Sequence, residues 1–198
     1  MFLKYLDRRQ FIAGSLTVAI CSVVSSQPPA QASQLNQDNY EFSLNGWPVQ
    51  NPADEVSTIK KCDISGISSS CEMRIGDVNI ILSDLVRQMH YRVKDIKPGE
   101  ISGWKAKTEE AIQTPYSNLS SGTALQIRPS MPIDSYFAYE IKIIQEVLKD
   151  YEGIVSWGGD MTNKDESLFY INASPEDPLF LEVAEKVRVR NFADVRIN

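Results

Sequence analysis

The sequence predicts an α+β domain in which helices flank a small antiparallel sheet. Two segments carry apolar residues at helical spacing, and three short segments are apolar or aromatic like strands. Because these segments do not alternate as regular strand–helix–strand units, antiparallel pairing is favoured over a parallel sheet. With 198 residues, 42% of them hydrophobic, the chain has the size of one domain plus a short additional segment.

The N-terminal segment has the pattern of an export signal. A basic start that includes Arg8 and Arg9 precedes an apolar stretch over 11–24, which is too short and too polar to span a membrane. The paired arginines fit a twin-arginine signal, and Ala30-Gln31-Ala32 fits a signal-peptidase site. We therefore expect a signal peptide over residues 1–32, cleaved after Ala32, with an uncleaved amphipathic anchor as the alternative.

This signal implies a destination and limits the partners. The twin-arginine translocase would export the folded chain to the periplasm or an equivalent lumen. The signal carries a net charge of +2, so the remaining chain carries −8 against −6 for the whole sequence. A basic surface for nucleic acid is therefore not expected. Residues 33–40 are polar and are predicted to be a flexible linker, before a domain over 41–187 and a tail over 188–198.

Two cysteines follow the signal, Cys62 and Cys71. In an oxidising compartment a structural disulfide is expected between them, with two free thiols as the first alternative and a metal-binding pair as the second.

The elements of the domain follow from local patterns. Residues 40–52, "YEFSLNGWPVQNP", predict an entry strand or turn. A helix is predicted from Asp77, as its cap, to the "KPG" at 97–99, with the single histidine, His90, at the edge of its apolar stripe. A strand is predicted over about 123–128.

The second half of the domain is read in the same way. A helix is predicted from Asp134, as its cap, to Gly153. "IVSW" and "SLFYIN" predict two neighbouring strands, and Asp177-Pro178 opens a last short helix before an extended tail.

Four short motifs together resemble a known family. "SLNGWPV", "SNLSSGTALQI", "WGGDM" and "DESLFYI" occur in the order and near the spacing found in VanY-like D-alanyl-D-alanine carboxypeptidases and L-alanyl-D-glutamate endopeptidases. These are bacterial cell-wall zinc peptidases that share a fold with the Hedgehog signalling domain. The resemblance covers about residues 42–185 and implies that fold here; its alternative is an accidental match of a turn and a core strand.

The resemblance also implies positions for a zinc site. In the family, a histidine and an aspartate of one motif and a histidine of another hold zinc, and an aspartate acts as general base. The ligand positions fall on Leu119, Gln126 and Leu168 in this chain, while Asp165 keeps the base position. Leucine has no lone pair, and a neutral amide is a poor ligand for a dication. We therefore expect no zinc or other cofactor, and Leu119 and Leu168 are expected to form an apolar floor.

Other readings of these residues remain as alternatives. A serine nucleophile at 117, 120 or 121 lacks a base, since the chain has one histidine. A calcium site built from Asp134, Asp160 and Asp165 lacks the regular ligand spacing of a calcium loop. Arg128 is placed to face the former metal cleft with Gln126 and bind a carboxylate, or else to turn to solvent before Pro129.

The sequence thus predicts an exported, non-catalytic relative of the peptidoglycan zinc carboxypeptidases. Its groove is expected to bind the stem peptide of peptidoglycan or an envelope protein. One alternative is an active D-alanyl-D-alanine carboxypeptidase-type hydrolase, and another is a structural envelope protein that acts through protein partners. The predicted groove-binding residues are Ser117, Asn118, Ser121, Thr123, Arg128, Trp157 and Asp160.

Overall fold

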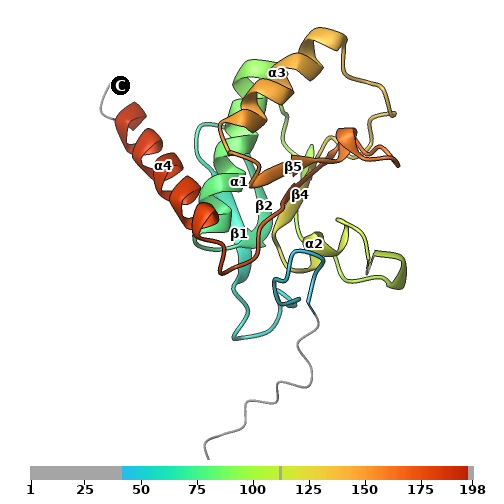
Figure 1. Cartoon of the computed structure of the whole chain (residues 1–198), viewed down its shortest axis with the longest axis vertical. Coiled ribbons are helices and arrows are strands. Elements are labelled where there is room, and N and C mark those ends of the chain that lie inside the picture. The colour runs from blue at the N-terminus through green and yellow to red at the C-terminus, as the bar shows by residue number, and fades with distance from the viewer. Residues whose placement is uncertain (1–41, 112, 196–198) are drawn as a thin grey trace, which may run out of the picture. The chain divides into compact units, whose positions relative to one another are not determined.

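The computed structural model describes residues 42–111 and 113–195 and has the predicted α+β fold class, with helices around small antiparallel sheets (Figure 1). The predicted signal at 1–32, the linker at 33–40 and the last residues of the tail lie outside the described residues. Within the described part, no helix combines the length and the apolar character needed to cross a membrane.

A four-stranded antiparallel sheet lies at the centre of the domain. Its strand order is β3-β4-β6-β5, with the bounds β3 Ile101–Ser102, β4 Ala124–Ile127, β5 Val155–Trp157 and β6 Leu168–Ile171. The three predicted strands are therefore confirmed, as is the pairing of β5 with β6. The entry segment forms a turn closed by an isolated bridge between Phe42 and Pro48.

A separate hairpin, which the sequence analysis did not predict, joins β1 (Ile59–Ile64) to β2 (Ser69–Arg74). Cys62 and Cys71 are direct cross-strand partners in this hairpin, and neither forms a disulfide in the structure. Residues opposite each other in an antiparallel pair lie about 4.5–5.5 Å apart at Cα, within the span of a disulfide. The disulfide stays a prediction.

The first of the two predicted helices begins where predicted and the second begins later, and neither has its predicted cap. α1 covers Asp77–Gln88 and continues as a π-helical turn, Met89–Val93. Gly76 occupies the N-cap position, so Asp77 is not the predicted cap. α3 covers Ala138–Lys149 and begins four residues after Asp134. Asp134 does not cap it, because the side chain of Glu140 accepts a hydrogen bond of 2.7 Å from the backbone N–H of Phe137 instead.

The C-terminal segment also corrects the prediction. α4 covers Pro178–Val195, so residues 188–195 are helical and not an extended tail. Two arginines of this segment reach α1: Arg188 pairs with Asp77 at 2.6 Å, and Arg190 pairs with the buried Asp84. These ion pairs and the packing of α4 on α1 stabilise a helix that its weak apolar periodicity does not indicate.

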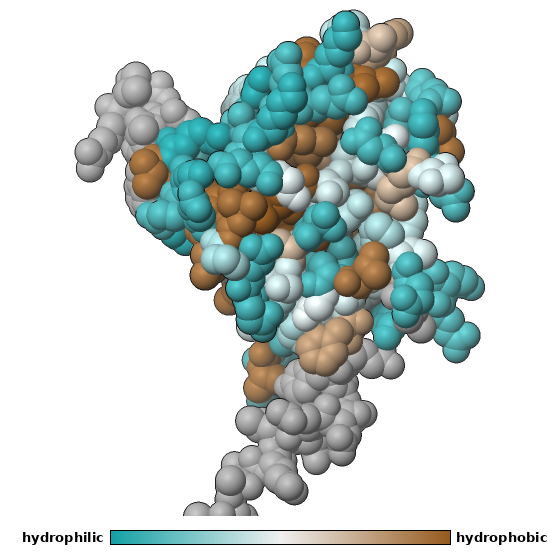
Figure 2. Space-filling view, viewed as in Figure 1, coloured by the Kyte–Doolittle hydropathy of each residue, from teal (hydrophilic) through white to brown (hydrophobic). Residues whose placement is uncertain are grey.

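The two faces of the central sheet have different neighbours. Leu125 and Phe169 point into the main core, which α1, α3 and α4 help to form. Ala124 and Leu168 point to the other face, where they pack with Leu119 of α2 (Ser117–Ser120) in a second, smaller cluster. Figure 2 shows that hydrophobic and hydrophilic residues are interspersed on the face in view. The candidate site lies on the α2 face.

Candidate functional site

The three positions that correspond to metal ligands come together in the structure. Gln126 of β4 and Leu168 of β6 are direct cross-strand partners. Leu119 and Leu168 belong to the same buried cluster, and they are 3% and 0% exposed. The apolar floor predicted from the sequence is therefore present. We call these three residues and Asp165 the Gln126 site.

Asp165 lies at the centre of a hydrogen-bond network. Its Oδ2 accepts bonds from the hydroxyl of Tyr116 at 2.7 Å and from Nε2 of Gln126 at 3.1 Å. Its Oδ1 accepts from the hydroxyl of Ser167 at 2.6 Å and from the backbone N–H of Ser167 at 2.9 Å. Burial would raise the pKa of Asp165, but these bonds outweigh it and lower the pKa below its ordinary value. The carboxylate is therefore held in its ionised form.

The turn before Asp165 explains how the chain places it. The backbone N–H of Asp165 donates to the carbonyl of Gly158 at 3.1 Å. A Cβ atom at Gly158 would lie 2.4 Å from the carbonyl oxygen of Asp165, so only glycine allows this approach. The first glycine of "WGGD" thus allows the backbone of Asp165 to lie at this position.

Lys105 adds a positive charge to the site. Its ammonium group donates a hydrogen bond to Oε1 of Gln126, whose amide nitrogen donates to Asp165 and, at 3.1 Å, to Ser167. Gln126 thus separates the cation from the anion. Among the described residues, Lys105 has no carboxylate in salt-bridge contact.

A groove of about 350 Å³ opens beside this lysine. We call it the Lys105 groove; its lining residues are Lys105, Ala106, Thr108, Glu110, Ala111, Thr114, Tyr116, Leu119 and Gln126. It therefore touches two of the three ligand positions directly. Apolar walls with a few placed polar groups are typical of small-molecule sites.

The residues of the Gln126 site do not fit zinc. Two of the three positions are leucines, and the amide oxygen of the third already accepts a bond from Lys105. No group of three or more histidine, cysteine or acidic residues suited to a metal occurs in the part of the chain that the structure describes. His90 accepts a bond of 3.0 Å from the backbone N–H of Ile96, which gives it a structural contact in the loop after α1.

Four of the predicted groove-binding residues point inward instead. Ser117, Asn118, Ser121 and Thr123 are at most 1% exposed. They hold the "SLNGW" segment: Ser117 accepts from the backbone of Leu44 at 2.8 Å, Ser121 from the hydroxyl of Ser43 at 2.9 Å, and Thr123 from Nδ2 of Asn45 at 2.9 Å. These polar residues satisfy each other in the interior, which leaves no surface for a ligand.

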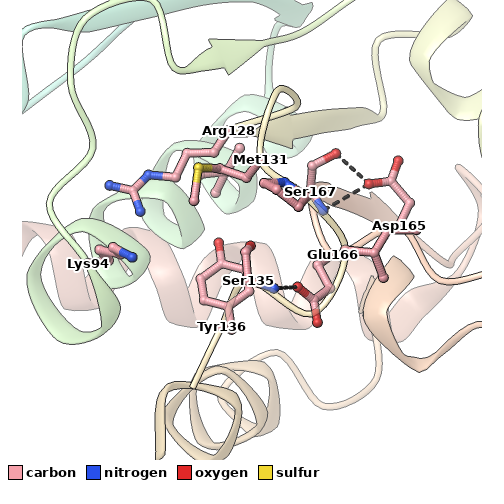
Figure 3. Close-up of a pocket in the computed structure, with 11 residues that line it drawn as sticks. Lys94, Arg128, Met131, Ser135, Tyr136, Asp165, Glu166 and Ser167 are labelled. Carbon is pink, nitrogen blue, oxygen red and sulfur yellow. Dashed lines mark hydrogen bonds between the residues drawn. The ribbon is translucent and has the colours of Figure 1, made fainter. Parts of the chain in front are cut away.

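Arg128 does not face the Gln126 site either. β4 ends one residue before it, and its φ of 56° turns the chain out of the strand alternation. Its Nε donates to Glu100 at 3.1 Å, and it lines a small pocket of about 20 Å³. In Figure 3 its side chain points away from Asp165. The predicted carboxylate contact at Arg128 is therefore not formed in the site.

The two remaining predicted groove residues differ from each other. Trp157 is 3% exposed and belongs to the main core, where its Nε1 donates to the carbonyl of Glu166 at 2.8 Å. Asp160 is exposed, and its side chain has no partner among the described residues.

No protein-family model, curated protein or solved structure matches this chain.

Sequence reasoning missed three residues of the site. Ser167 had a local signal, since an aspartate side chain often accepts a hydrogen bond from the backbone N–H two residues on. Tyr116 precedes the "SNLSSG" motif and Lys105 lies in a loop after β3, and neither position shows a pattern that indicates its role. Their contacts arise only when distant segments meet.

Proposed function

We propose that this domain is a non-catalytic binding module, related to the VanY-like zinc peptidases with the Hedgehog-like fold, that is exported and binds a cell-wall peptide. The observation that carries this proposal is the convergence of Leu119, Gln126 and Leu168 on one face of the sheet, next to a groove. The three positions that the family resemblance assigns to metal ligands thus lie on one face, yet they carry side chains that do not bind metal.

The chemistry of the groove supports a ligand with a carboxylate. Zinc in a peptidase supplies positive charge next to the substrate. In this chain the ammonium group of Lys105 supplies a positive charge at Gln126. Apolar Leu119, Ala106 and Ala111 lie beside it. A short peptide with small side chains and a free C-terminal carboxylate matches this combination of charge and apolar surface.

A binding experiment tests the function. Calorimetric titration with a peptide ending in D-alanyl-D-alanine is expected to give saturable binding, and amidation of the peptide's C-terminus is expected to weaken it by about tenfold, the loss of one charge-assisted hydrogen bond. Lys105→Ala should abolish this difference between the free and the amidated peptide. Lys164→Ala, which removes a surface lysine paired with Asp134, serves as the control.

Peptide cleavage that stops on chelation would favour the active hydrolase. Binding of neither peptide would overturn the proposal and direct the search to protein partners.

Restoring the ligands tests the geometry behind the proposal. A variant with Leu119→His, Gln126→Asp and Leu168→His is expected to bind one zinc ion and to gain thermal stability when zinc is added. A variant with only Gln126→Asp should show no such gain. If the triple variant folds but its melting temperature does not respond to zinc, the three positions do not form a metal-site geometry.

A further inference from the structure

A second groove lies on the same face of the sheet as the Gln126 site. It has a volume of about 390 Å³ and lies at the β5 edge, between Leu148 of α3 and Tyr170 of β6. Tyr170 is the cross-strand partner of both Ala124 and Ser156, so these three residues share one face. Met161 and Tyr170, which line this groove, also pack on the Leu119 cluster that borders the Lys105 groove. We call it the Tyr170 groove.

Polar side chains without partners surround the Tyr170 groove. Five of its lining residues carry a polar group that has no hydrogen bond or ion pair with any residue of 42–111 or 113–195: Gln145, Lys149, Ser156, Asp160 and Tyr170. They include an amide, two hydroxyls, one cation and one anion. Both donors and acceptors are thus available to a ligand.

The composition of the groove selects among ligand classes. Lys149 and Asp160 carry opposite charges, so the groove has no net charge to attract an ion. A peptide strand cannot add to β5, because Val155 and Trp157, which form its ends, are each only 3% exposed. A sugar ring has an apolar face of C–H groups and a rim of hydroxyls. It can pack on an aromatic ring while its hydroxyls bond to surrounding polar groups.

We propose that the Tyr170 groove binds a neutral saccharide, with the ring of Tyr170 and the side chain of Met161 against one sugar face. Asp160, in the turn after β5, and Gln145, on α3, bond the hydroxyls. This inference rests on the proposed function for the source of the saccharide, because cell-wall material joins a saccharide to the peptide that the Lys105 groove would take. The saccharide site itself is tested independently of the peptide.

The experiment titrates the full-length chain separately with chitotriose, with maltotriose and with the D-alanyl-D-alanine peptide, by calorimetry. We expect at least one trisaccharide to bind. Combining Asp160→Ala with Gln145→Ala should weaken that binding by about tenfold or more, because two exposed hydrogen-bonding groups are removed. Tyr170→Phe should keep most of the affinity and Tyr170→Ala should lose it. Tyr139→Ala, which removes an exposed tyrosine outside the groove, should have no effect.

The outcomes separate the two proposals. If neither trisaccharide binds, or if the Asp160 and Gln145 variant binds as wild type does, the saccharide site is overturned whatever the peptide does. If a trisaccharide binds and the peptide does not, the proposed function is overturned and the saccharide site stands. Lys105→Ala should weaken peptide binding and leave trisaccharide binding unchanged, which shows that the grooves act separately.

Discussion

Asp165 stays charged in a partly buried site because three side chains donate hydrogen bonds to it. Burial, together with its hydrogen bond to Asp165, raises the pKa of Tyr116 to about 12, so the phenol remains a donor at neutral pH. In a catalytic site, a base with a lowered pKa would be poorly matched to proton transfer at neutral pH. The network is better suited to hold the Gln126 amide and, through it, Lys105.

Removing one donor tests this account. Tyr116→Phe deletes the 2.7 Å bond and is expected to raise the pKa of Asp165 towards its ordinary value of 3.8 and to cost about 1 kcal/mol of stability. The carboxyl pKa is measured by NMR titration and the stability by urea unfolding. Tyr139→Phe, at an exposed tyrosine with no hydrogen bond among the described residues, is the control. An unchanged Asp165 pKa in the Tyr116 variant would contradict the account.

The same network predicts a dependence of stability on pH. The folded pKa of Asp165 lies below the unfolded one, so its contribution is fully present above the ordinary pKa and is lost as the pH falls through the folded pKa. Between pH 5 and pH 2, a window of about three units around the ordinary value, the free energy of unfolding of Asp165→Asn should therefore fall less steeply than that of the wild type. Equal slopes in the two proteins would show that Asp165 is not coupled to folding.

At position 122 both the backbone conformation and the neighbouring atoms require glycine. Its φ is 69°, and a Cβ atom there would lie 2.8 Å from the backbone nitrogen of Arg74. Gly99 has a similar φ of 85° but no atom within 4 Å of that position.

We expect Gly99→Ala to cost about 1 kcal/mol, the backbone strain alone, and Gly122→Ala to cost roughly 3 kcal/mol, since the clash is added. Chemical denaturation of both variants measures the difference. Equal losses of stability in the two variants would mean that β2 and the turn at Gly122 move apart without cost.

At the scale of elements, α4 is anchored by a buried carboxylate. Asp84 of α1 is 2% exposed, and it accepts hydrogen bonds from Arg190 of α4, from Arg87 at 2.6 Å and from the hydroxyl of Tyr151 at 2.7 Å. The bond and the negative charge of Asp84 add to burial in raising the pKa of Tyr151 above its ordinary value. The helices α1 and α4 and the turn after α3 thus meet at one charged group.

Two arginines of the same helix provide a matched test. Arg190→Ala leaves Asp84 with one cation fewer and is expected to cost about 2 kcal/mol, less than a fully unpaired buried charge because Arg87 remains. Arg188→Ala removes a half-exposed pair with Asp77 and an exposed pair with Glu185, and it should leave stability close to that of the wild type. If both variants lose the same stability in urea unfolding, the ion pair between Arg190 and Asp84 does not anchor α4.

At the scale of the whole molecule, the sheet divides the described domain into a packing side, which faces the main core, and a side that carries the two grooves. The main core fills one face, and the other face has only a small apolar cluster between two grooves. The hairpin β1–β2 extends the packing side and holds the two cysteines. Burial and the neighbouring thiol raise the pKa of Cys71 to about 12, so it reacts slowly as a free thiol.

The proposed export predicts the state of these thiols. Protein recovered from an oxidising compartment should carry a Cys62–Cys71 disulfide, detected by mass spectrometry of peptides without reduction, and should unfold at higher urea concentration than the reduced form. The expected gain is about 2–3 kcal/mol. Cys62→Ser combined with Cys71→Ser is the control, since it should show no difference between oxidising and reducing conditions. Free thiols in the exported protein would contradict the disulfide.

The sequence by itself determined the fold class and three of the strands, because these features depend on local periodicity, which is written along the chain. That Leu119, Gln126 and Leu168 would come together was implied only by the family resemblance. Only the tertiary structure decided the rest. The serines, Asn118 and Thr123 look like groove residues in sequence, but they satisfy one another and the "SLNGW" segment inside the fold. The place of Lys105, the ion pairs of Asp84 and the packing of the hairpin depend on contacts between segments that are far apart in the chain. No single stretch of sequence indicates these contacts.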